Sequence, residues 1–389
     1  MVSRVSKRRS VLITLSTSGG GDRYPVIALA CGLKDRGDQV TVLCDVATSK
    51  LIASTGLDTL IIPPEYGQDK FLLPWWQELS ETESGPDENT VNPIAEWGTI
   101  TRPIVQETVA KINPDLIIST LLSMGLADAL ATHFGIPWCF VNPGFYLGEN
   151  PTSQWDDDYY GSIVIWLNKS CFLPLSQRAN IVLHATDQEF DFEPSQFPSN
   201  HHYVGVLLWE APSILPEYIN DPGNPWALIT LSTFADEDSL SLARSVLWGL
   251  ADHPVRSLLP LADVHLRDKL GELPNNATVT EYVPHSLVLK QASIVVSHAG
   301  HGIVSKALYF GVPMVLCPWA LDQPGVAARA KALGVAKVVR RANVSPETVQ
   351  QAVTTVLNNP KYRETATRVS ARLKSTDAVD VAYRLLESF

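Results

Sequence analysis

The sequence predicts an α/β protein in which two doubly wound parallel sheets face a central cleft. The chain has 389 residues, which is too long for one ordinary core and suggests at least two domains. Short, continuously apolar runs alternate with helix-like segments, as in parallel sheets that are covered on both faces. The same alternation starts again after a proline-rich stretch, so each half of the chain predicts a sheet of its own.

Residues 1–206 carry the first set of expected elements. The expected strands are VLITL (11–15), VTVLC (40–44), DLIIST (115–120) and PWCFVN (137–142), and the expected helices include YPVIALACGLKDRG (24–37) and GLADALATHFG (125–135). This strand-helix-strand order is typical of a doubly wound sheet. A less patterned insert at 63–98 contains Trp75, Trp76 and Trp97. Long aromatic inserts often line a binding site, although anchoring of a loop to the core explains these residues equally well.

A linker is expected at 207–225, because LLWEAPSILPEYINDPGNP is rich in proline and has no periodic pattern. The second domain is expected at 226–375, with the strands WALITLST (226–233), VRSLLPLA (255–262), ATVTEYV (277–283), SIVVSHAG (293–300) and PMVLCP (313–318). Helices are expected between them, including SLSLARSVLWGLA (239–251) and GVAARAKALG (325–334). The last segment, 376–389, is expected to be a helix that crosses back to the first domain.

The composition is that of a globular protein, with 45% hydrophobic and 18% charged residues. A net charge of −11 argues against a nucleic-acid binder. The five cysteines have no CxxC or metal-type spacing and indicate buried thiols in a reducing compartment. The apolar run near the basic start is too short for a signal peptide or a transmembrane segment, so a cytoplasmic protein is expected. Lys7, Arg8 and Arg9 would suit peripheral contact with an acidic membrane surface, and no feature sets the oligomeric state.

Two glycine-containing turns follow expected strands and should meet at one cleft. In TLSTSGGGDRYP (14–25), the consecutive glycines Gly19, Gly20 and Gly21 lack the GxGxxG spacing of a dinucleotide site. Asp22 also stands where a phosphate would meet a carboxylate. Asp22 is therefore a candidate general base. The alternative role is that of an N-cap for the next helix.

The second turn lies in VVSHAGHGIVSKALYFGVP (295–313), where Gly300 and Gly302 relax the backbone at an expected helix start. A helix start presents unpaired N–H groups and the positive end of a dipole, so it suits an anion. His298 lies just before this start and is a candidate hydrogen-bond donor to a phosphate. The alternative is that the glycines only turn the chain.

The stretch 297–339 resembles the donor-binding signature of nucleotide-sugar-dependent glycosyltransferases of the two-Rossmann (GT-B) type. Its order is a His, a glycine-rich turn, Ala-Leu, Gly-Val-Pro and Asp-Gln. GGGDRYP (19–25) resembles the Gly-Asp-x-x-Pro opening of the bacterial antibiotic and sterol enzymes, and EYVPHSLVL (281–289) resembles the family's Val-Pro-His element. These motifs span both halves in the expected order, whereas 45–228 match only in pattern. The resemblance implies two Rossmann-like domains that face a cleft.

The resemblance also implies an activity and a set of site residues. It implies an inverting, metal-independent transfer of a hexose or deoxyhexose from a UDP- or dTDP-sugar, a co-substrate, to a hydroxyl of a small lipophilic acceptor. Asp22 and His298 are then the catalytic residues. The implied donor-binding residues are Ser232, Thr233, Val283, His285, His298, Gly300, Gly302, Ile303, Asp322 and Gln323. The aromatic residues expected to face the acceptor are Trp75, Trp76, Phe145 and Tyr146.

Several positions depart from the family pattern. Lys306 stands where most members have a Glu that holds the ribose, and Ile303 replaces a Thr that touches phosphate. An ammonium group has no hydrogen-bond acceptor, so we expect little discrimination between UDP and 2′-deoxy-UDP. Ala299 replaces a Gly, and Val326 replaces an Asn near the sugar. Two alternatives stay open, namely a nucleotide-sugar-binding protein without catalytic activity and a sugar-nucleotide epimerase on the same fold.

Overall fold

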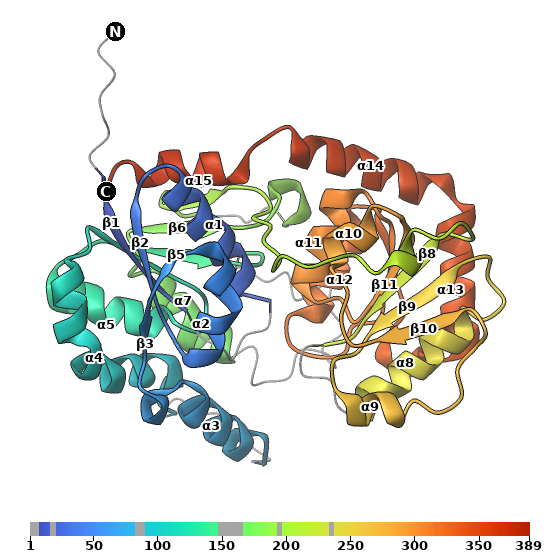
Figure 1. Ribbon diagram of the computed structural model, residues 1–389, viewed down its shortest axis with the longest axis horizontal. Coiled ribbons are helices and arrows are strands. Elements are labelled where there is room, and N and C mark those ends of the chain that lie inside the picture. The colour runs from blue at the N-terminus through green and yellow to red at the C-terminus, as the bar shows by residue number, and fades with distance from the viewer. Residues whose placement is uncertain (1–7, 16–20, 82–89, 147–165, 193–196, 233–236) are drawn as a thin grey trace, which may run out of the picture.

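The computed structural model describes residues 8–15, 21–81, 90–146, 166–192, 197–232 and 237–389. Figure 1 shows two lobes, each built around one sheet. All the strand pairs recorded within each sheet are parallel. The two-sheet α/β architecture predicted from the sequence is therefore present.

The first sheet has seven strands in the order β3-β2-β1-β4-β5-β6-β7. The strands are β1 (Ser10–Thr14), β2 (Gln39–Cys44), β3 (Asp58–Ile61), β4 (Leu116–Ser119), β5 (Trp138–Asn142), β6 (Ile181–His184) and β7 (His201–Tyr203). The helices are α1 (Arg23–Asp35), α2 (Val46–Ile52), α3 (Asp69–Glu81), α4 (Pro93–Ile112), α5 (Met124–Phe134) and α7 (Leu173–Ser176). Short η segments lie at Ala53–Thr55, Pro64–Tyr66, Leu167–Phe172 and Gln188–Phe190.

Both faces of this sheet are covered, which explains why its strands are apolar throughout. Val11 and Ile13 of β1 pack with α1, whereas Leu12 packs with α4 and α5 on the other face. Side chains of a strand alternate between the two faces, so each strand needs apolar residues at every position. Helices α4 and α5 approach so closely that a Cβ on Gly98 would lie 2.2 Å from the backbone of Gly125, and the glycine makes this approach possible.

The second sheet has six strands in the order β10-β9-β8-β11-β12-β13. The strands are β8 (Trp226–Thr230), β9 (Arg256–Pro260), β10 (Ala277–Thr280), β11 (Ala292–Ser297), β12 (Met314–Leu316) and β13 (Ala336–Val338). The helices are α8 (Glu237–Gly249), α9 (Val264–Asp268), α10 (His285–Leu289), α11 (His301–Phe310), α12 (Gln323–Ala332), α13 (Pro346–Asn358) and α14 (Pro360–Lys374), with a short η segment at Arg341–Asn343. Two buried clusters, one on each face, form its core.

The chain returns to the first domain at its C-terminal end. Helix α15 (Ala378–Leu386) packs against α1, and Figure 1 shows it on the lobe opposite to α14. A Cβ on Gly32 of α1 would lie 2.1 Å from Val379, so the glycine allows this close approach. The Arg36 guanidinium lies 3.7 Å from carboxylate oxygens of both Asp377 and Asp380. The last helix thus ties the second domain to the first.

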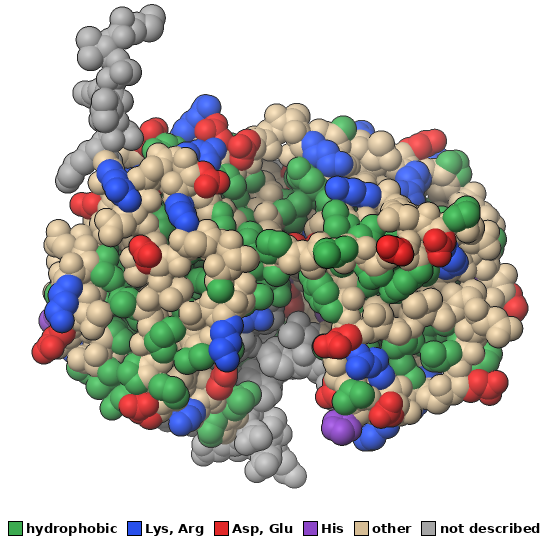
Figure 2. All heavy atoms as spheres, viewed as in Figure 1, with side chains coloured by type: hydrophobic (Ala, Val, Ile, Leu, Met, Phe, Trp, Pro, Cys, Tyr) green, Lys and Arg blue, Asp and Glu red, His purple; other side chains and the backbone are tan. Residues whose placement is uncertain are grey.

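Figure 2 shows a groove between the two lobes on one face of the molecule. The segments that follow β1 and β11 approach each other between the lobes, because a Cβ on Gly302 would lie 3.9 Å from the Cα of Gly21. In each sheet the strand order reverses beside a central strand, between β1 and β4 and between β8 and β11. Ligands of open α/β sheets bind at such switch points. The segments that follow β1, β4, β8 and β11 are therefore the ones to inspect for a site. No described helix is long and apolar enough to cross a membrane.

Candidate active site

Asp22 lies at the start of α1 with an unpartnered carboxylate. It occupies the N-cap position, but its backbone is helical (φ −74°, ψ −26°) and its side chain accepts no capping hydrogen bond. A capping side chain needs the extended backbone that turns it back over the first turn. Both carboxylate oxygens are buried and have no hydrogen-bond partner among the residues described. The capping alternative is therefore wrong.

A rigid polar network lies next to Asp22 at the ends of β1 and β4. The Ser123 hydroxyl donates to the Thr14 carbonyl at 2.7 Å and accepts from the Thr120 N–H at 3.1 Å. Burial raises the pKa of the Asp22 carboxyl from its ordinary 3.8 to about 7, while the Arg23 charge lowers it. Thr120 and the backbone of Leu122 also lower this pKa. A carboxyl with a pKa near 7 is suited to take up a proton at neutral pH.

His298 follows β11 on the other side of the groove. Its Nδ1 lies 3.2 Å from the Thr230 carbonyl, and burial lowers its pKa to about 4. A carbonyl only accepts, so Nδ1 carries the proton and Nε2 of the neutral ring is an acceptor. A contact from Nε2 to a phosphate therefore requires a second proton on the ring. A Cβ on Gly300 would lie 2.5 Å from Nε2, so a side chain at this position would displace the His298 ring.

The starts of α1 and α11 face each other across the groove. A Cβ on Gly302 would lie 3.9 Å from the Cα of Gly21, and both glycines are exposed. Gly300 caps α11 with an extended backbone, and Ala299 before it is left-handed with φ of 70°. An L-residue is strained in that region, where the family resemblance implies a Gly. The N–H groups at the start of α11 therefore face the groove opposite Gly21, which is the residue before Asp22.

Of the other implied donor-binding residues, some are buried in the core of the second domain and some follow its strands. Val283 and Ile303 are buried in the core of the second domain, and burial lowers the pKa of His285 to about 4. Asp322 lies exposed just before α12, and desolvation by the surrounding protein raises the pKa of its carboxyl to about 6. The Gln323 side-chain oxygen accepts from the Trp319 and Ala320 N–H groups at 2.8 and 3.0 Å. Ser232 follows β8, and Thr233 lies outside the described residues.

Lys306 is paired with a carboxylate of the linker. Its Nζ lies 2.5 Å from Glu210 Oε1, and Glu210 Oε2 accepts from the Ser286 N–H at 3.0 Å. Their side chains are 13% and 17% exposed, so the pair is largely removed from water. The Lys306 ammonium and these hydrogen bonds hold the pKa of Glu210 below its ordinary value although burial alone would raise it. A carboxylate that is ionised at neutral pH therefore lies beside Lys306, where the family pattern has its own carboxylate replaced by an ammonium.

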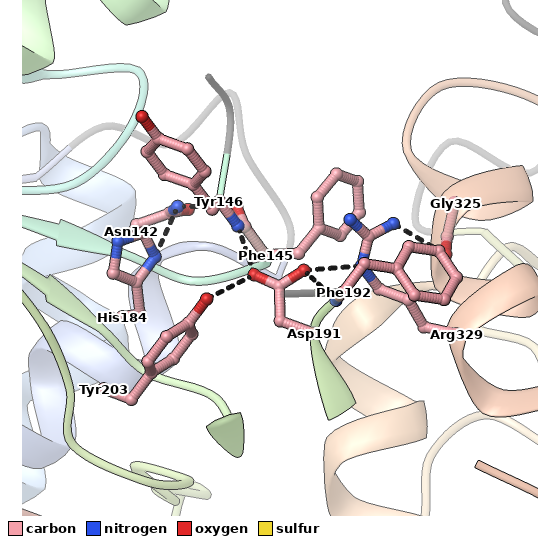
Figure 3. Close-up of polar contacts among 9 residues, drawn as sticks. All are labelled: Asn142, Phe145, Tyr146, His184, Asp191, Phe192, Tyr203, Gly325 and Arg329. Carbon is pink, nitrogen blue, oxygen red and sulfur yellow. Dashed lines mark hydrogen bonds and ion pairs between the residues drawn. The ribbon is translucent and has the colours of Figure 1, made fainter. Parts of the chain in front are cut away.

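A buried ion pair joins the two domains beside the groove (Figure 3). Asp191, from the first domain, accepts from Arg329 Nε of α12 at 2.8 Å, and both side chains are 1% exposed. The other Asp191 oxygen accepts from the Tyr203 hydroxyl at 2.8 Å and from the Tyr146 N–H at 2.6 Å. Such a fully partnered pair fixes geometry, because loss of either partner leaves a buried charge.

Comparisons with known proteins agree with this geometry. Residues 256–387 match the family described as "Erythromycin biosynthesis protein CIII-like, C-terminal domain". "UDP-glycosyltransferase 2" of Phaeomoniella chlamydospora is 28% identical over 204 residues, which are 49% of this chain and 44% of that protein. The glycosyltransferase SnogD from Streptomyces nogalater has a TM-score of 0.75 at 17% identity, over 98% of this chain and 99% of that one. Residues 256–387 thus match this family, and the chain as a whole has the GT-B fold of the solved glycosyltransferases.

Two further facts limit what these comparisons show about the chain. The chain spans about half the length of the curated relatives it matches. The glycosyltransferase VinC, solved in complex with dTDP, has a TM-score of 0.70 at 18% identity and covers 97% of this chain and 98% of its own. At this identity the structural likeness concerns the GT-B fold.

The aromatic residues expected at the acceptor side lie in different surroundings. Phe145 and Tyr146 are 5% and 8% exposed, and the Arg329 guanidinium lies 3.8 Å above the Phe145 ring. These two residues pack at the junction of the domains rather than on an open face. Trp75 of α3 is partly exposed and stacks on Trp166 with 5.8 Å between ring centroids. The side chain of Trp76 lies outside the described residues.

Three residues of this GT-B site were missed by sequence reasoning. Glu210 lies in the linker, Asp191 lies in an irregular segment, and His301 is the second histidine of the turn that contains His298. A charged residue in a proline-rich linker and a second histidine three residues after His298 are weak signals, and neither indicates its partner. Within the described residues no group of three His, Cys, Asp or Glu could hold a metal ion. Residues 156–158, the acidic run, lie outside them.

Proposed function

We propose that this protein is an inverting glycosyltransferase that moves a hexose or deoxyhexose from a UDP- or dTDP-sugar to a hydroxyl of a small lipophilic acceptor. The observation that carries the proposal is the buried, unpartnered Asp22 carboxyl, with a pKa near 7, opposite the start of α11. Relatives named UDP-glycosyltransferases support the reaction class, and VinC with dTDP supports a nucleoside diphosphate donor.

The proposed reaction is a single displacement. The Asp22 carboxylate takes the proton of the acceptor hydroxyl, and the hydroxyl oxygen forms a bond to the anomeric carbon. The bond from that carbon to the diphosphate breaks on the opposite face, which inverts the configuration. The N–H groups at the start of α11 and a doubly protonated His298 stabilise the charge that builds on the diphosphate. This arrangement uses no metal ion.

Glu210 changes the expectation for the ribose. The family resemblance implies a ribose beside position 306, and Lys306 and the Ser286 N–H hold Glu210 at that position. Each Glu210 oxygen has a further lone pair, and a carboxylate accepts bonds from hydroxyl groups. We therefore propose that the linker supplies the ribose acceptor that position 306 lacks. UDP would then be preferred over 2′-deoxy-UDP, contrary to the expectation drawn from Lys306 alone.

The test is a mass-spectrometric screen of UDP-, dTDP- and GDP-sugars against a mixed panel of polyketide, phenolic, sterol and carotenoid acceptors. NMR spectra of the products then give the anomeric configuration and identify epimers, which mass alone does not distinguish. Transfer with inverted configuration supports the proposal. Binding of a nucleotide sugar with neither transfer nor hydrolysis would identify the non-catalytic alternative. Conversion of the donor sugar to its epimer without an acceptor would identify the epimerase, which needs several acid and base groups around the sugar.

A further inference from the structure

His301 is a titratable group at the groove that the proposed reaction leaves without a task. It is the first residue of α11, and its Nδ1 lies 3.2 Å from the Ser305 hydroxyl one turn later. Its ring meets the edge of Phe190 with 5.8 Å between centroids, and its Cδ2 is 3.9 Å from the place of a Cβ on Gly144. The imidazole therefore points from the second domain toward the first.

The other ring nitrogen, Nε2, is buried without a hydrogen-bond partner in the parts of the chain that are described. Such an atom costs about 1–3 kcal/mol, so native structures keep few of them. The Asp22 carboxylate and the Ser119 hydroxyl at the end of β4 are unpartnered in the same way. His301 precedes Gly302, and Asp22 follows Gly21, the two glycines that approach each other across the groove. The unpartnered groups of both domains therefore flank one space.

The chemistry of the ring selects a partner. Burial lowers the pKa of His301 to about 4, with Asp191 raising it and Arg329 lowering it, so the ring is neutral at pH 7. A neutral imidazole offers one donor or one acceptor at Nε2, according to its tautomer. A hydroxyl group fits both tautomers because it donates and accepts, whereas a phosphate oxygen fits only one. The partner class is therefore a hydroxyl.

We propose that Nε2 of His301 hydrogen-bonds a hydroxyl of the bound substrates and orients the reacting pair toward Asp22. This inference rests on the proposed function, in which Asp22 receives the proton of the acceptor hydroxyl. The hydroxyl bound by His301 belongs either to the acceptor or to the transferred sugar. His301 binds and positions it, and no proton passes to the ring.

The experiment compares His301→Phe, which keeps a ring but removes the nitrogen, with His301→Gln, which returns a polar group. The probes are UDP-glucose and dTDP-glucose, with 4-methylumbelliferone as acceptor and with water. Loss of one neutral hydrogen bond is expected to lower kcat/KM by about 2- to 13-fold in His301→Phe. Its melting temperature should stay close to that of the wild type, because removal of the unpartnered Nε2 offsets the loss of the Nδ1 contact with the Ser305 hydroxyl. His301→Gln should recover part of the activity.

Ser257→Ala is the matched control. The Ser257 hydroxyl is also buried and unpartnered, but it lies near the start of β9, at the end of the strand opposite to the groove. Its removal should leave transfer unchanged. If His301→Phe loses transfer but keeps donor hydrolysis by water, the hydroxyl is that of the acceptor. If transfer and donor hydrolysis both fall, and the affinity for UDP-glucose falls relative to that for UDP, the hydroxyl is that of the transferred sugar.

Two results would overturn the inference. One is a His301→Phe variant with wild-type kcat/KM, and the other is a variant that loses stability and activity together, which indicates packing. If the wild type neither transfers nor hydrolyses, the proposed function fails, and calorimetry then decides about His301 separately. In that case no acceptor hydroxyl is left to consider, so an equal UDP-glucose to UDP affinity ratio in the wild type and His301→Phe overturns the inference, whereas a changed ratio supports it.

Discussion

Replacing Asp22 by Asn should make the protein more stable and less active at the same time. The carboxyl has a pKa of about 7 in the fold against an ordinary value of 3.8. At 1.36 kcal/mol per pKa unit, the ionised side chain costs the native state up to about 4 kcal/mol above pH 7. An Asn of the same shape has no charge to bury, so this cost disappears. Turnover should fall by about 10²- to 10⁴-fold with the loss of the base.

The sign of the pH dependence follows from proton binding. Between pH 4 and pH 7 the native Asp22 holds a proton that the unfolded chain has lost, so wild-type stability falls as pH rises. The stability gain of Asp22→Asn should therefore be near zero at pH 4 and largest at pH 8. Urea unfolding at pH 4, 6 and 8 measures it, and transfer is assayed in parallel.

Asp263→Asn is the control, because the pKa of Asp263 is shifted in the direction opposite to that of Asp22. Asp263 is a true N-cap that accepts from the His265 and Leu266 N–H groups at 2.8 and 3.1 Å, and these bonds lower its pKa. Its substitution should give no gain at pH 8. The reasoning about Asp22 is refuted if Asp22→Asn shows no extra stability at pH 8, or if the gain is the same at pH 4. Full activity in Asp22→Asn would contradict the role of Asp22 as the general base.

Three other predictions concern the donor side. The wild type should bind UDP about 10- to 150-fold more tightly than 2′-deoxy-UDP in calorimetry, and Glu210→Gln should remove this preference. Glu281→Gln, an exposed control, should keep it. If the wild type shows no such preference, Glu210 does not bind the ribose and the expectation drawn from Lys306 alone holds. UDP binding at pH 7 should take up as much as one proton, because the neutral His298 must gain one to donate to a phosphate. Titration in two buffers of different ionisation enthalpy measures this uptake, and equal uptake in His298→Gln contradicts it. Transfer should survive EDTA, and loss on chelation with recovery in Mg²⁺ would direct attention to the acidic run at 156–158.

The local pattern of the sequence determined the fold and the position of two site residues. Continuous apolar runs appear where strands are covered on both faces, and this pattern gave the two sheets and the central strands β1, β4, β5, β8 and β11. The shorter strands β3, β6, β7 and β13 carry three or four residues each and were not among the strands expected. Asp22 and His298 were found because each follows a strand at a glycine turn, which is a local signal.

Only the tertiary structure decided the chemistry of those residues. The pKa of Asp22 depends on burial by segments distant in the chain, which no spacing reveals. Lys306 meets Glu210 across 96 positions, and Arg329 meets Asp191 across 138. The Asp22 cap was a sound expectation from residue type, but a helical backbone at that residue turned the side chain away. A sequence carries periodicity and turn chemistry, whereas desolvation and the pairing of charges are set by residues that only folding brings together.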